Sequence, residues 1–468
     1  MMPYMKTYNT IARSASLRKP ATTRVQNVAS LNIYLAINVC LICPLLTFIT
    51  FIAFITFICL FETAMCQCQM YLSHLIVALI ACIACTLADT SLAASTTYPL
   101  PSILTPARAT DPQFSQSPLQ HSSFSVNSTV EYGKMEDPSN LYILYRDGGG
   151  SCPITNRTLW FFCDTLAYRE TDGTFVGAAS NSVSLATNFS LPNILMDASC
   201  TPATGFNPAI PFTSAEAALA GHPSSRYALW TFTNCVPTGD NSSVHFWEVV
   251  KFTSTSTYYI KGNTMAQYSL NTTSNNFTVT RASQITFAPP TYMYGTFANV
   301  VVDGVAYLYG LDISYSRNDV HLAMAPVSTI TDLSTWEYYN ASSQTWNSTM
   351  PVPTQREQSA AVIHNSIPFS TGTVFFSEYH NAFLLVFFDN YADSKYQVLS
   401  APSPIGPWTK TNAVIWALTP GPGGFSYGGL AHSFYYTNDG PAGKSLMLHY
   451  SYRNTSATYA VANKLTFN

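Results

Sequence analysis

Short runs of β-branched and aromatic residues, separated by turn residues, fill the chain from about residue 131 to its end. Examples are LYILYR, RYALWTF, HFWEVVKF, VAYLYGL and AFLLVFFD. Val, Tyr, Phe and Trp favour strands, and the Gly, Asn, Asp and Pro residues between the runs favour turns. No segment keeps the spacing of an amphipathic helix beyond about two turns, and only residues 214–220 suggest one short helix. The predicted fold class is therefore all-β.

The strand-like runs recur in groups. A group that begins at Gly295 contains a strand, an Asp-Gly turn, a second strand, a loop, a third strand and then Trp336. The same order begins again at Gly372, ends at Trp408, and starts a third time at Tyr427. Two earlier segments fit this order more loosely, 226–262 and 141–178. Repeated units of about four strands are typical of propeller blades, so we predict a five-bladed β-propeller, with two packed β-sheets as the alternative.

The first 94 residues have a different character. Residues 31–61 form an apolar run that is long enough to cross a bilayer. A second, shorter apolar run over 75–87 ends in small residues, as the cleavage site of a secretory signal peptide does. Two interpretations remain: the first run is a retained membrane anchor, or the natural start of the protein is Met65 or Met70. Both interpretations predict that the rest of the chain is exported.

The remainder divides into a Ser/Thr/Pro-rich linker over 95–130 and a propeller domain over 131–468. Only 10% of the residues are charged and 14% are aromatic, which excludes a disordered chain. The net charge of -3 and the absence of a basic run argue against a nucleic-acid partner. We expect a monomer that contacts a membrane only if the 31–61 segment is retained. No metal or cofactor is predicted, because no phosphate loop, zinc motif or dinucleotide fingerprint is present.

Four cysteines follow the hydrophobic region: Cys152, Cys163, Cys200 and Cys235. An even number of cysteines in an exported domain predicts two disulfides, for which three pairings are possible. Pairing Cys152 with Cys163 and Cys200 with Cys235 closes the shortest loops. A zinc site is a weaker hypothesis, because the four cysteines include no Cys-x-x-Cys spacing.

Asparagine glycosylation sequons occur only after residue 94. The nine sequon asparagines are Asn127, Asn156, Asn188, Asn241, Asn271, Asn276, Asn340, Asn347 and Asn454. Such an asymmetric distribution is typical of a secreted eukaryotic glycoprotein. We therefore predict an extracellular protein, with a membrane-anchored form as the alternative.

Two aspartates are the candidate catalytic residues. Asp147 precedes three glycines, which leave its carboxylate unshielded, and Asp164 follows the apolar run LWFFC. Carboxyl groups on adjacent strands can reach the separation that glycoside hydrolysis requires. The simpler interpretation is that both are turn residues, because Asp-Gly is a common hairpin turn.

The motifs DGGGS, LWFFCDT, RYALW and SAPSPIGPW resemble the family called domain of unknown function 4185, which is linked to glycoside hydrolase family 183. The resemblance covers about residues 135–468. It implies a five-bladed propeller related to arabinanases, and the two catalytic aspartates of the family fall on Asp147 and Asp164. This sequence departs from the family by placing Cys152 and Cys163 around that hairpin.

The predicted function is a secreted glycoside hydrolase that cleaves furanosidic, arabinan-like polysaccharide. A non-catalytic, lectin-like propeller is the alternative, because both functions need an acidic, aromatic pocket. Apolar neighbours raise the pKa of a carboxyl group, so Asp164 is expected to be the acid and Asp147 the nucleophile or base. Further candidates for substrate binding are Trp160, Glu248, Glu378 and His432.

Overall fold

The computed structural model of the protein describes residues between 95 and 468, in segments separated by gaps. They are 95–99, 124–136, 142–154, 157–186, 195–197, 200–201, 205–206, 208–219, 225–255, 257–271, 276–282, 285–311, 319–351, 361–364, 369–389, 394–417, 425–453 and 457–468. The predicted signal peptide and the 31–61 run lie outside these residues. In the segments just given, no helix is both long enough and apolar enough to cross a membrane.

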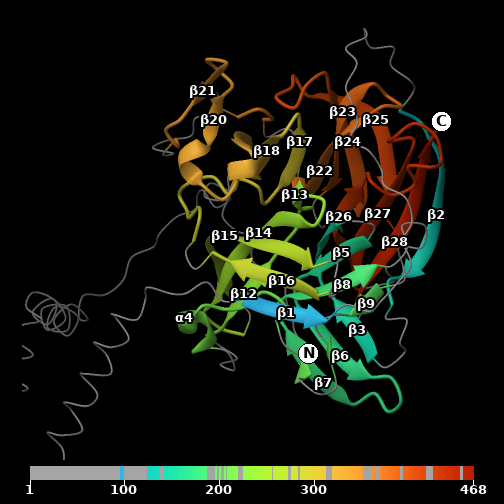
Figure 1. The fold of residues 1–468 in the computed structure, drawn as a ribbon. Helices are drawn as coiled ribbons and strands as arrows, with labels where there is room; N and C mark the ends of the chain where they lie inside the picture. Colours follow the sequence, from blue (N-terminus) through green and yellow to red (C-terminus); the bar gives the residue numbers. More distant parts are fainter. Residues whose placement is uncertain are drawn as a thin grey trace, which may run out of the picture. The chain divides into compact units, whose positions relative to one another are not determined.

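The described residues form antiparallel sheets and very few helices, so the fold is nearly all-β (Figure 1). The short helices are α4 (Ser214–Ala217), which confirms the helix expected there, and two 3₁₀ turns, η1 (Val327–Thr329) and η2 (Leu333–Thr335). A capping box between Thr213 and Glu216 begins α4.

The repeat unit that begins near Gly372 is one four-stranded sheet. Its strands are β22 (Phe369–Ser377), β23 (Ala382–Asp389), β24 (Lys395–Ala401) and β25 (Thr409–Trp416). The turn between β22 and β23 is the expected one, because Asn381 has a φ of 49°. Asn tolerates this left-handed conformation better than most residues, which explains why the turn is placed here.

The unit that begins near Tyr427 is completed by a strand from the start of the domain. Its sheet runs in the order β2 (Val126–Lys134), β28 (Thr458–Phe467), β27 (Ser445–Arg453) and β26 (Phe425–His432). The strand β2 therefore replaces part of the linker predicted over 95–130, and β1 (Ser95–Pro99) replaces another part. Both corrections arise from pairing with distant strands, which a Ser/Thr-rich composition does not reveal.

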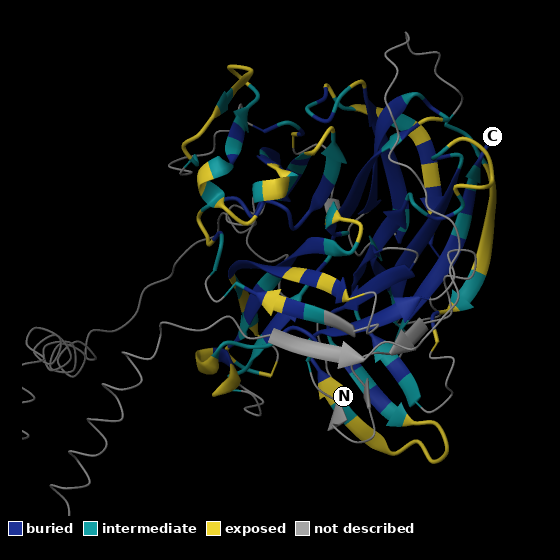
Figure 2. Cartoon of the chain, in the orientation of Figure 1, coloured by how far each residue is buried: buried dark blue, intermediate teal, exposed yellow. Residues whose placement is uncertain are grey.

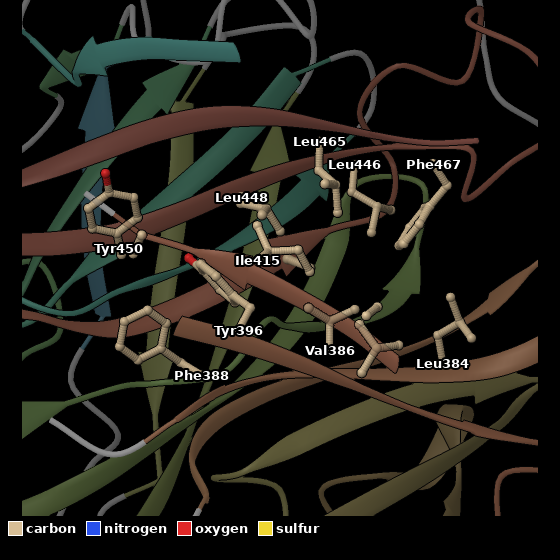
Figure 3. Packing of buried hydrophobic residues seen from close by; sticks show 14 of the residues in the cluster. Leu384, Val386, Phe388, Tyr396, Ile415, Leu446, Leu448, Tyr450, Leu465 and Phe467 are labelled. Carbon is tan, nitrogen blue, oxygen red and sulfur yellow. The ribbon is translucent and has the colours of Figure 1, made fainter. Parts of the chain in front are cut away.

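The apolar face between these two sheets shows how alternation builds the core (Figure 3). Leu384, Val386 and Phe388 lie on one face of β23, and Leu446 and Leu448 lie on one face of β27. All five are 0% exposed, and those of one strand share a face because side chains two residues apart point the same way; the opposite faces of β23 and β27 are buried as well. Complete burial of such a side chain contributes roughly 1.5–3 kcal/mol each.

The unit that begins near Gly295 forms a five-stranded sheet. Its strands are β17 (Ala298–Val302), β18 (Val305–Leu311), β19 (Val320–Pro326), β20 (Glu337–Asn340) and β21 (Thr345–Asn347). Asp303 and Gly304 make the predicted turn with φ values of 49° and 77°. Trp336, which closes the repeat in sequence, is completely buried beneath this sheet.

The segment 226–262 belongs to a six-stranded sheet. Its strands are β12 (Tyr227–Trp230), β13 (Val236–Gly239), β14 (Ser242–Phe252), β15 (Tyr258–Asn271), β16 (Asn276–Arg281) and the N-terminal β1. Both β12 and β13 pair with the long strand β14. β12 and β13 therefore act as one strand that is interrupted at residues 231–235.

The segment 141–178 has the same interruption in two strands. One sheet holds β3 (Tyr142–Arg146), β6 (Thr165–Arg169) and β7 (Phe175–Ala179), and the other holds β4 (Gly150–Ile154), β5 (Arg157–Phe162), β8 (Ser182–Ala186) and β9 (Leu195–Asp197). A separate pair, β10 (Cys200–Thr201) and β11 (Gly205–Phe206), follows. Burial is concentrated in the inner strands, whereas β2 and β7 carry exposed positions (Figure 2).

The first strands of successive sheets lie next to one another. The Cys235 amide, beside β13, donates to the Ser151 carbonyl of β4 at 3.1 Å, and β13 lies beside β17. In turn β17 lies beside β22, and the Thr371 hydroxyl of β22 donates to the Gly429 carbonyl of β26 at 2.6 Å. Ser151 also forms a hydrogen bond with His432 of β26, so the series returns to β4.

Candidate active site

The two aspartates lie opposite each other where paired strands are interrupted. Asp147 stands between β3 and β4, and Asp164 stands between β5 and β6. The Asp147 amide donates to the Asp164 carbonyl at 2.9 Å, and the Cys163 amide donates to the Asp147 carbonyl at 2.7 Å. The backbone ladder therefore continues through the interruption and holds the two residues side by side.

The glycines after Asp147 are required by the backbone. Gly148 and Gly149 have φ values of 57° and 137°, in the region that favours glycine. A Cβ atom on Gly148 would lie 2.6 Å from the Cys163 sulfur and 2.7 Å from the Phe232 ring. The half-buried Phe232 thus packs directly against the glycine turn. The DGGG motif is explained by this close approach as much as by access to a ligand.

Asp164 has two donors from the neighbouring sheet. The Trp230 indole nitrogen donates to Oδ1 at 3.2 Å, and the Arg226 guanidinium lies 3.4 Å from Oδ2. The side chain keeps 21% of its area exposed. Burial raises the pKa of Asp164, while the positive charge of Arg226 and the indole hydrogen bond oppose that rise. Both donors favour the ionised carboxylate.

Arg226 and Trp230 are held by aromatic rings of the same sheet. The Arg226 guanidinium lies 4.0 Å from the centroid of the Phe252 ring. The Trp230 ring meets Phe252 and Tyr258 edge to face, at 5.8 Å and 5.0 Å between centroids. The two donors are therefore positioned before any substrate arrives.

Asp147 has weaker compensation. Burial raises the pKa of its carboxyl group to about 7, although a hydrogen bond from the Tyr427 hydroxyl lowers it. The negative charge of Asp164 adds to the rise, and the positive charge of Arg453 opposes it. Tyr427 belongs to β26 and Arg453 to the end of β27, so a third sheet contributes to the site. The Asp147 carboxyl group can therefore carry a proton near neutral pH.

Glu248 is the third carboxyl group of the cluster. It lies on β14 opposite Trp230, the indole of which binds Asp164. Burial raises its pKa to about 7. Burial also raises the pKa of the Cys163 thiol, and the charges of Asp147, Asp164 and Glu248 all add to that rise. The sulfur of Cys163 therefore lies within electrostatic range of all three carboxyl groups.

The disulfide pairing predicted from loop length is wrong. Cys152 is bonded to Cys235, which joins β4 to the segment before β13, and Cys163 is a free buried thiol. The cross-strand partner of Cys152 is Leu159, four residues from Cys163. Four strand residues span about 13 Å, beyond the ~7 Å that a disulfide allows between Cα atoms. The side chain of Cys200 lies outside the described part of the chain.

The Cys163 thiol instead connects two sheets. Its sulfur lies 3.3 Å from the Thr231 amide and 3.2 Å from the Thr231 carbonyl oxygen, between β12 and β13. A sulfur can both accept and donate weak hydrogen bonds, so it satisfies two backbone groups at the interruption. Cys163 thereby fixes the neighbouring Asp164 against the sheet that carries Arg226 and Trp230.

Trp160 and His432 lie in the interior and not at a substrate surface. Both are 0% exposed. The Trp160 indole donates to the Tyr435 hydroxyl at 3.2 Å, and its ring lies 4.5 Å from the His432 ring. His432 binds the Ser151 hydroxyl and lies 2.8 Å from the His449 ring nitrogen. These side chains form a buried network between β4, β5 and the sheet of β26 and β27.

Glu378 lies beyond the end of β22, whereas the start of β22 lies near Tyr427 of β26. Glu378 is exposed, and its carboxylate accepts from the Ala442 amide at 3.3 Å. Thr371, near the start of β22, is the residue that contacts Gly429 close to Tyr427. The structure therefore does not bring Glu378 to Asp147.

Arg226, Trp230 and Tyr427 were not among the candidate residues. A strand from residue 226 would place Arg226 and Trp230 on the same face, since they are four residues apart. Both residues also belong to the motif RYALW, one of the motifs on which the family resemblance rests. The sequence around Tyr427 and Arg453 does not indicate a role at the site. These residues are distant from Asp147 in sequence, and only the folded chain brings their sheet to it.

The comparisons with known proteins identify the family. The model of the family described as Domain of unknown function (DUF5005) matches residues 146–437. The chain belongs to this family. The DUF5005 match includes Asp147, Asp164 and Glu248, and it does not confirm the family 4185 that the sequence motifs resemble. No curated protein matches the chain.

Solved structures resemble the chain only distantly. A Bacteroides ovatus protein is 16% identical, with a TM-score of 0.49 over 69% of this chain and 85% of that one. A family 117 glycoside hydrolase of Zobellia galactanivorans is 10% identical, with a TM-score of 0.42 over 74% and 92%. The exo-β-1,3-galactanase of Phanerochaete chrysosporium is 10% identical, with a TM-score of 0.40 over 71% and 63%.

Proposed function

We propose that this DUF5005 protein is a glycoside hydrolase whose chemistry is carried by Asp147 and Asp164. The observation that supports it is a cluster of three carboxyl groups whose environments differ. Asp164 faces a guanidinium and an indole, whereas the pKa of Asp147 and that of Glu248 are raised to about 7 by burial. Glycoside hydrolysis needs one carboxylic acid and one carboxylate, and unequal environments provide both at one pH.

The contacts favour roles opposite to those expected from the flanking residues. Asp164 is the carboxylate that attacks the anomeric carbon or activates water, because Arg226 and Trp230 stabilise its charge. Asp147 is the acid that protonates the leaving oxygen, and the Tyr427 hydroxyl orients its carboxyl group. Glu248, uncharged below about pH 7, limits the negative charge of the cluster.

The proposed architecture around this site is a five-bladed propeller. The first strands of five sheets would surround an axis, and the contacts from β4 through β13, β17, β22 and β26 back to β4 support this arrangement. The N-terminal β2 would close the ring by pairing with β28, the last strand. Asp147 and Phe232 then lie where first strands approach one another.

The proposed setting is extracellular. The disulfide between Cys152 and Cys235 is of a kind that persists in oxidising compartments. The sequon asparagines with described side chains are exposed or half-buried: Asn127, Asn241, Asn271, Asn340 and Asn347. The side chains of Asn156, Asn188, Asn276 and Asn454 lie outside the described residues. We keep furanosidic, arabinan-like polysaccharide as the proposed substrate class.

One experiment tests the activity. The purified full chain is incubated with arabinan, galactan and xylan, and new reducing ends are measured beside binding on a glycan array. We expect reducing ends from a furanosidic polymer, and none from the Asp147→Asn protein. Binding without new reducing ends would replace the hydrolase with a carbohydrate-binding protein. If the protein shows no binding and no turnover, both proposed functions are overturned.

A further inference from the structure

A cavity lies on the sheet of β17 to β21, and it is lined by residues other than those of the carboxyl cluster. Its volume is about 260 Å³, and its walls come from β19, β20 and the residues that follow β20. The residues that line it include His321, Tyr338, Tyr339, Asn340, Asn347 and Ser348. None of the lining residues belongs to the set that surrounds Asp147 and Asp164. The cavity is therefore a separate structural feature.

Two polar side chains in the cavity wall are buried without a partner. His321 is 3% exposed and Tyr338 is 5% exposed. In the part of the chain that the structure describes, neither the His321 ring nitrogens nor the Tyr338 hydroxyl forms a hydrogen bond with protein. These polar atoms are not among the fully enclosed, unpaired atoms of the described residues, so they remain open to the cavity. Both groups line the cavity, so a ligand there would satisfy them.

The two rings are held in place before a ligand binds. The His321 ring stacks on the buried Tyr292 ring, with centroids 3.5 Å apart and planes 11° apart. The Tyr338 ring packs against Tyr294 at 5.3 Å. Fixed side chains lose little conformational entropy on binding, so a small polar ligand gains affinity from them.

The lining also restricts the charge of the ligand. It contains an imidazole, phenols, carboxamides and hydroxyls, and no Asp, Glu, Lys or Arg side chain. A charged ligand would be desolvated without a counter-charge, which is unfavourable. The side-chain oxygen Oδ1 of Asn340 accepts from the Ser342 amide at 3.0 Å and from the Ser342 hydroxyl at 2.7 Å. The side-chain amino group of Asn340 therefore remains as a donor. The half-buried Tyr339 adds an aromatic surface.

A neutral molecule with many hydroxyl groups and an apolar C–H face matches this combination of groups. We propose that the cavity between β19 and β20 binds one neutral sugar residue, through His321, Tyr338 and Asn340. This site does not require that the carboxyl cluster hydrolyses anything. Asn340 and Asn347 are themselves sequon residues, and an N-linked glycan on Asn340 would occupy its amino group, so this donor serves the site only in protein that carries no glycan there.

The test uses full-length protein carrying Asp147→Asn, secreted to the periplasm of a bacterial host that adds no N-glycan. Its histidines are labelled with ¹³C, and the His321 signal is assigned by its loss in His321→Phe, which keeps a ring against Tyr292. The protein is titrated with L-arabinose, D-galactose, D-xylose and D-glucose. Galacturonate is the charged comparison. Tyr338→Phe removes one hydroxyl, and Tyr307→Phe is the matched control on the same sheet, outside the cavity.

We expect at least one neutral sugar to shift the His321 signal saturably, and galacturonate to leave it unchanged. Tyr338→Phe should weaken that binding about 3- to 10-fold, the effect of one neutral hydrogen bond, and Tyr307→Phe should not change it. A His321 signal that no sugar moves, or equal affinity of Tyr338→Phe and its parent, would overturn the proposal. Hydrolysis is assayed separately at the carboxyl cluster, so failure of one proposal is distinguishable from failure of the other.

Discussion

Replacement of Glu248 by Gln should change how the stability of the protein depends on pH. Burial raises the folded-state pKa of Glu248 to about 7, whereas an unfolded glutamate titrates near about 4.3. The folded protein therefore binds a proton that the unfolded chain releases. The stabilisation is fully present below about pH 4.3 and is lost as the pH rises through about 7.

The size of the effect follows from the two pKa values. Between pH 5.0 and pH 8.5, Glu248 makes the wild-type protein lose about 2.5 kcal/mol of unfolding free energy. Gln has no proton to release, so the Glu248→Gln curve should lack this loss. The variant should gain about 2.5 kcal/mol relative to wild type over that interval.

The assay is denaturant unfolding at a series of pH values, followed by tryptophan fluorescence and circular dichroism. Glu378→Gln is the matched control, because Glu378 is exposed beyond the end of β22. Its stability should follow the wild-type curve. Parallel curves for Glu248→Gln and wild type would show that Glu248 is not held in a desolvated environment, and would refute the electrostatic argument for the cluster.

Three other predictions can be checked on the same protein. Asp147→Asn and Asp164→Asn should each lower the release of reducing ends about 100-fold or more with an unchanged circular dichroism spectrum, and near-normal turnover would exclude that residue. Replacement of Cys152 and Cys235, 83 residues apart, by Ala should lower the free energy of unfolding by about 4.5 kcal/mol, measured by denaturant titration; an unchanged midpoint would contradict it. Peptide-N-glycosidase should increase the gel mobility of the secreted protein, and no change in mobility would argue against glycosylation.

Strands and turns could be predicted because their signals are local. Leu384, Val386 and Phe388 belong to the continuous apolar run AFLLVFFD, and such a short run between turn residues predicts a strand that is buried on both faces, as β23 is. The Asp303-Gly304 turn likewise depends on the two residues that form it. The strand β2 could not be predicted, because Val126–Lys134 becomes a strand only by pairing with Thr458–Phe467 at the other end of the domain.

The disulfide shows the same division between local and distant information. Loop length favours nearby cysteines, but a hairpin fixes which residues can meet. Once Cys152 is paired in register with Leu159, Cys163 is out of reach, and the available partner is Cys235 on another sheet. The spacing of cysteines in sequence contains no register, so it could not distinguish these pairings.

The assignment of the acid turns on the same point. The residues before Asp164 are apolar and correctly indicate a partly desolvated carboxyl group, and this desolvation does raise its pKa. Local sequence cannot show the opposing charge, which comes from Arg226, 62 residues later. Asp147 has glycine neighbours that suggest exposure, yet it is half-buried beside Tyr427 from a distant sheet, and desolvation raises its pKa to about 7. Neighbours in sequence therefore identify Asp164 as a perturbed carboxyl group and miss Asp147. The ionic partners of the two groups decide which of them gives up its proton first, and those partners come from other sheets.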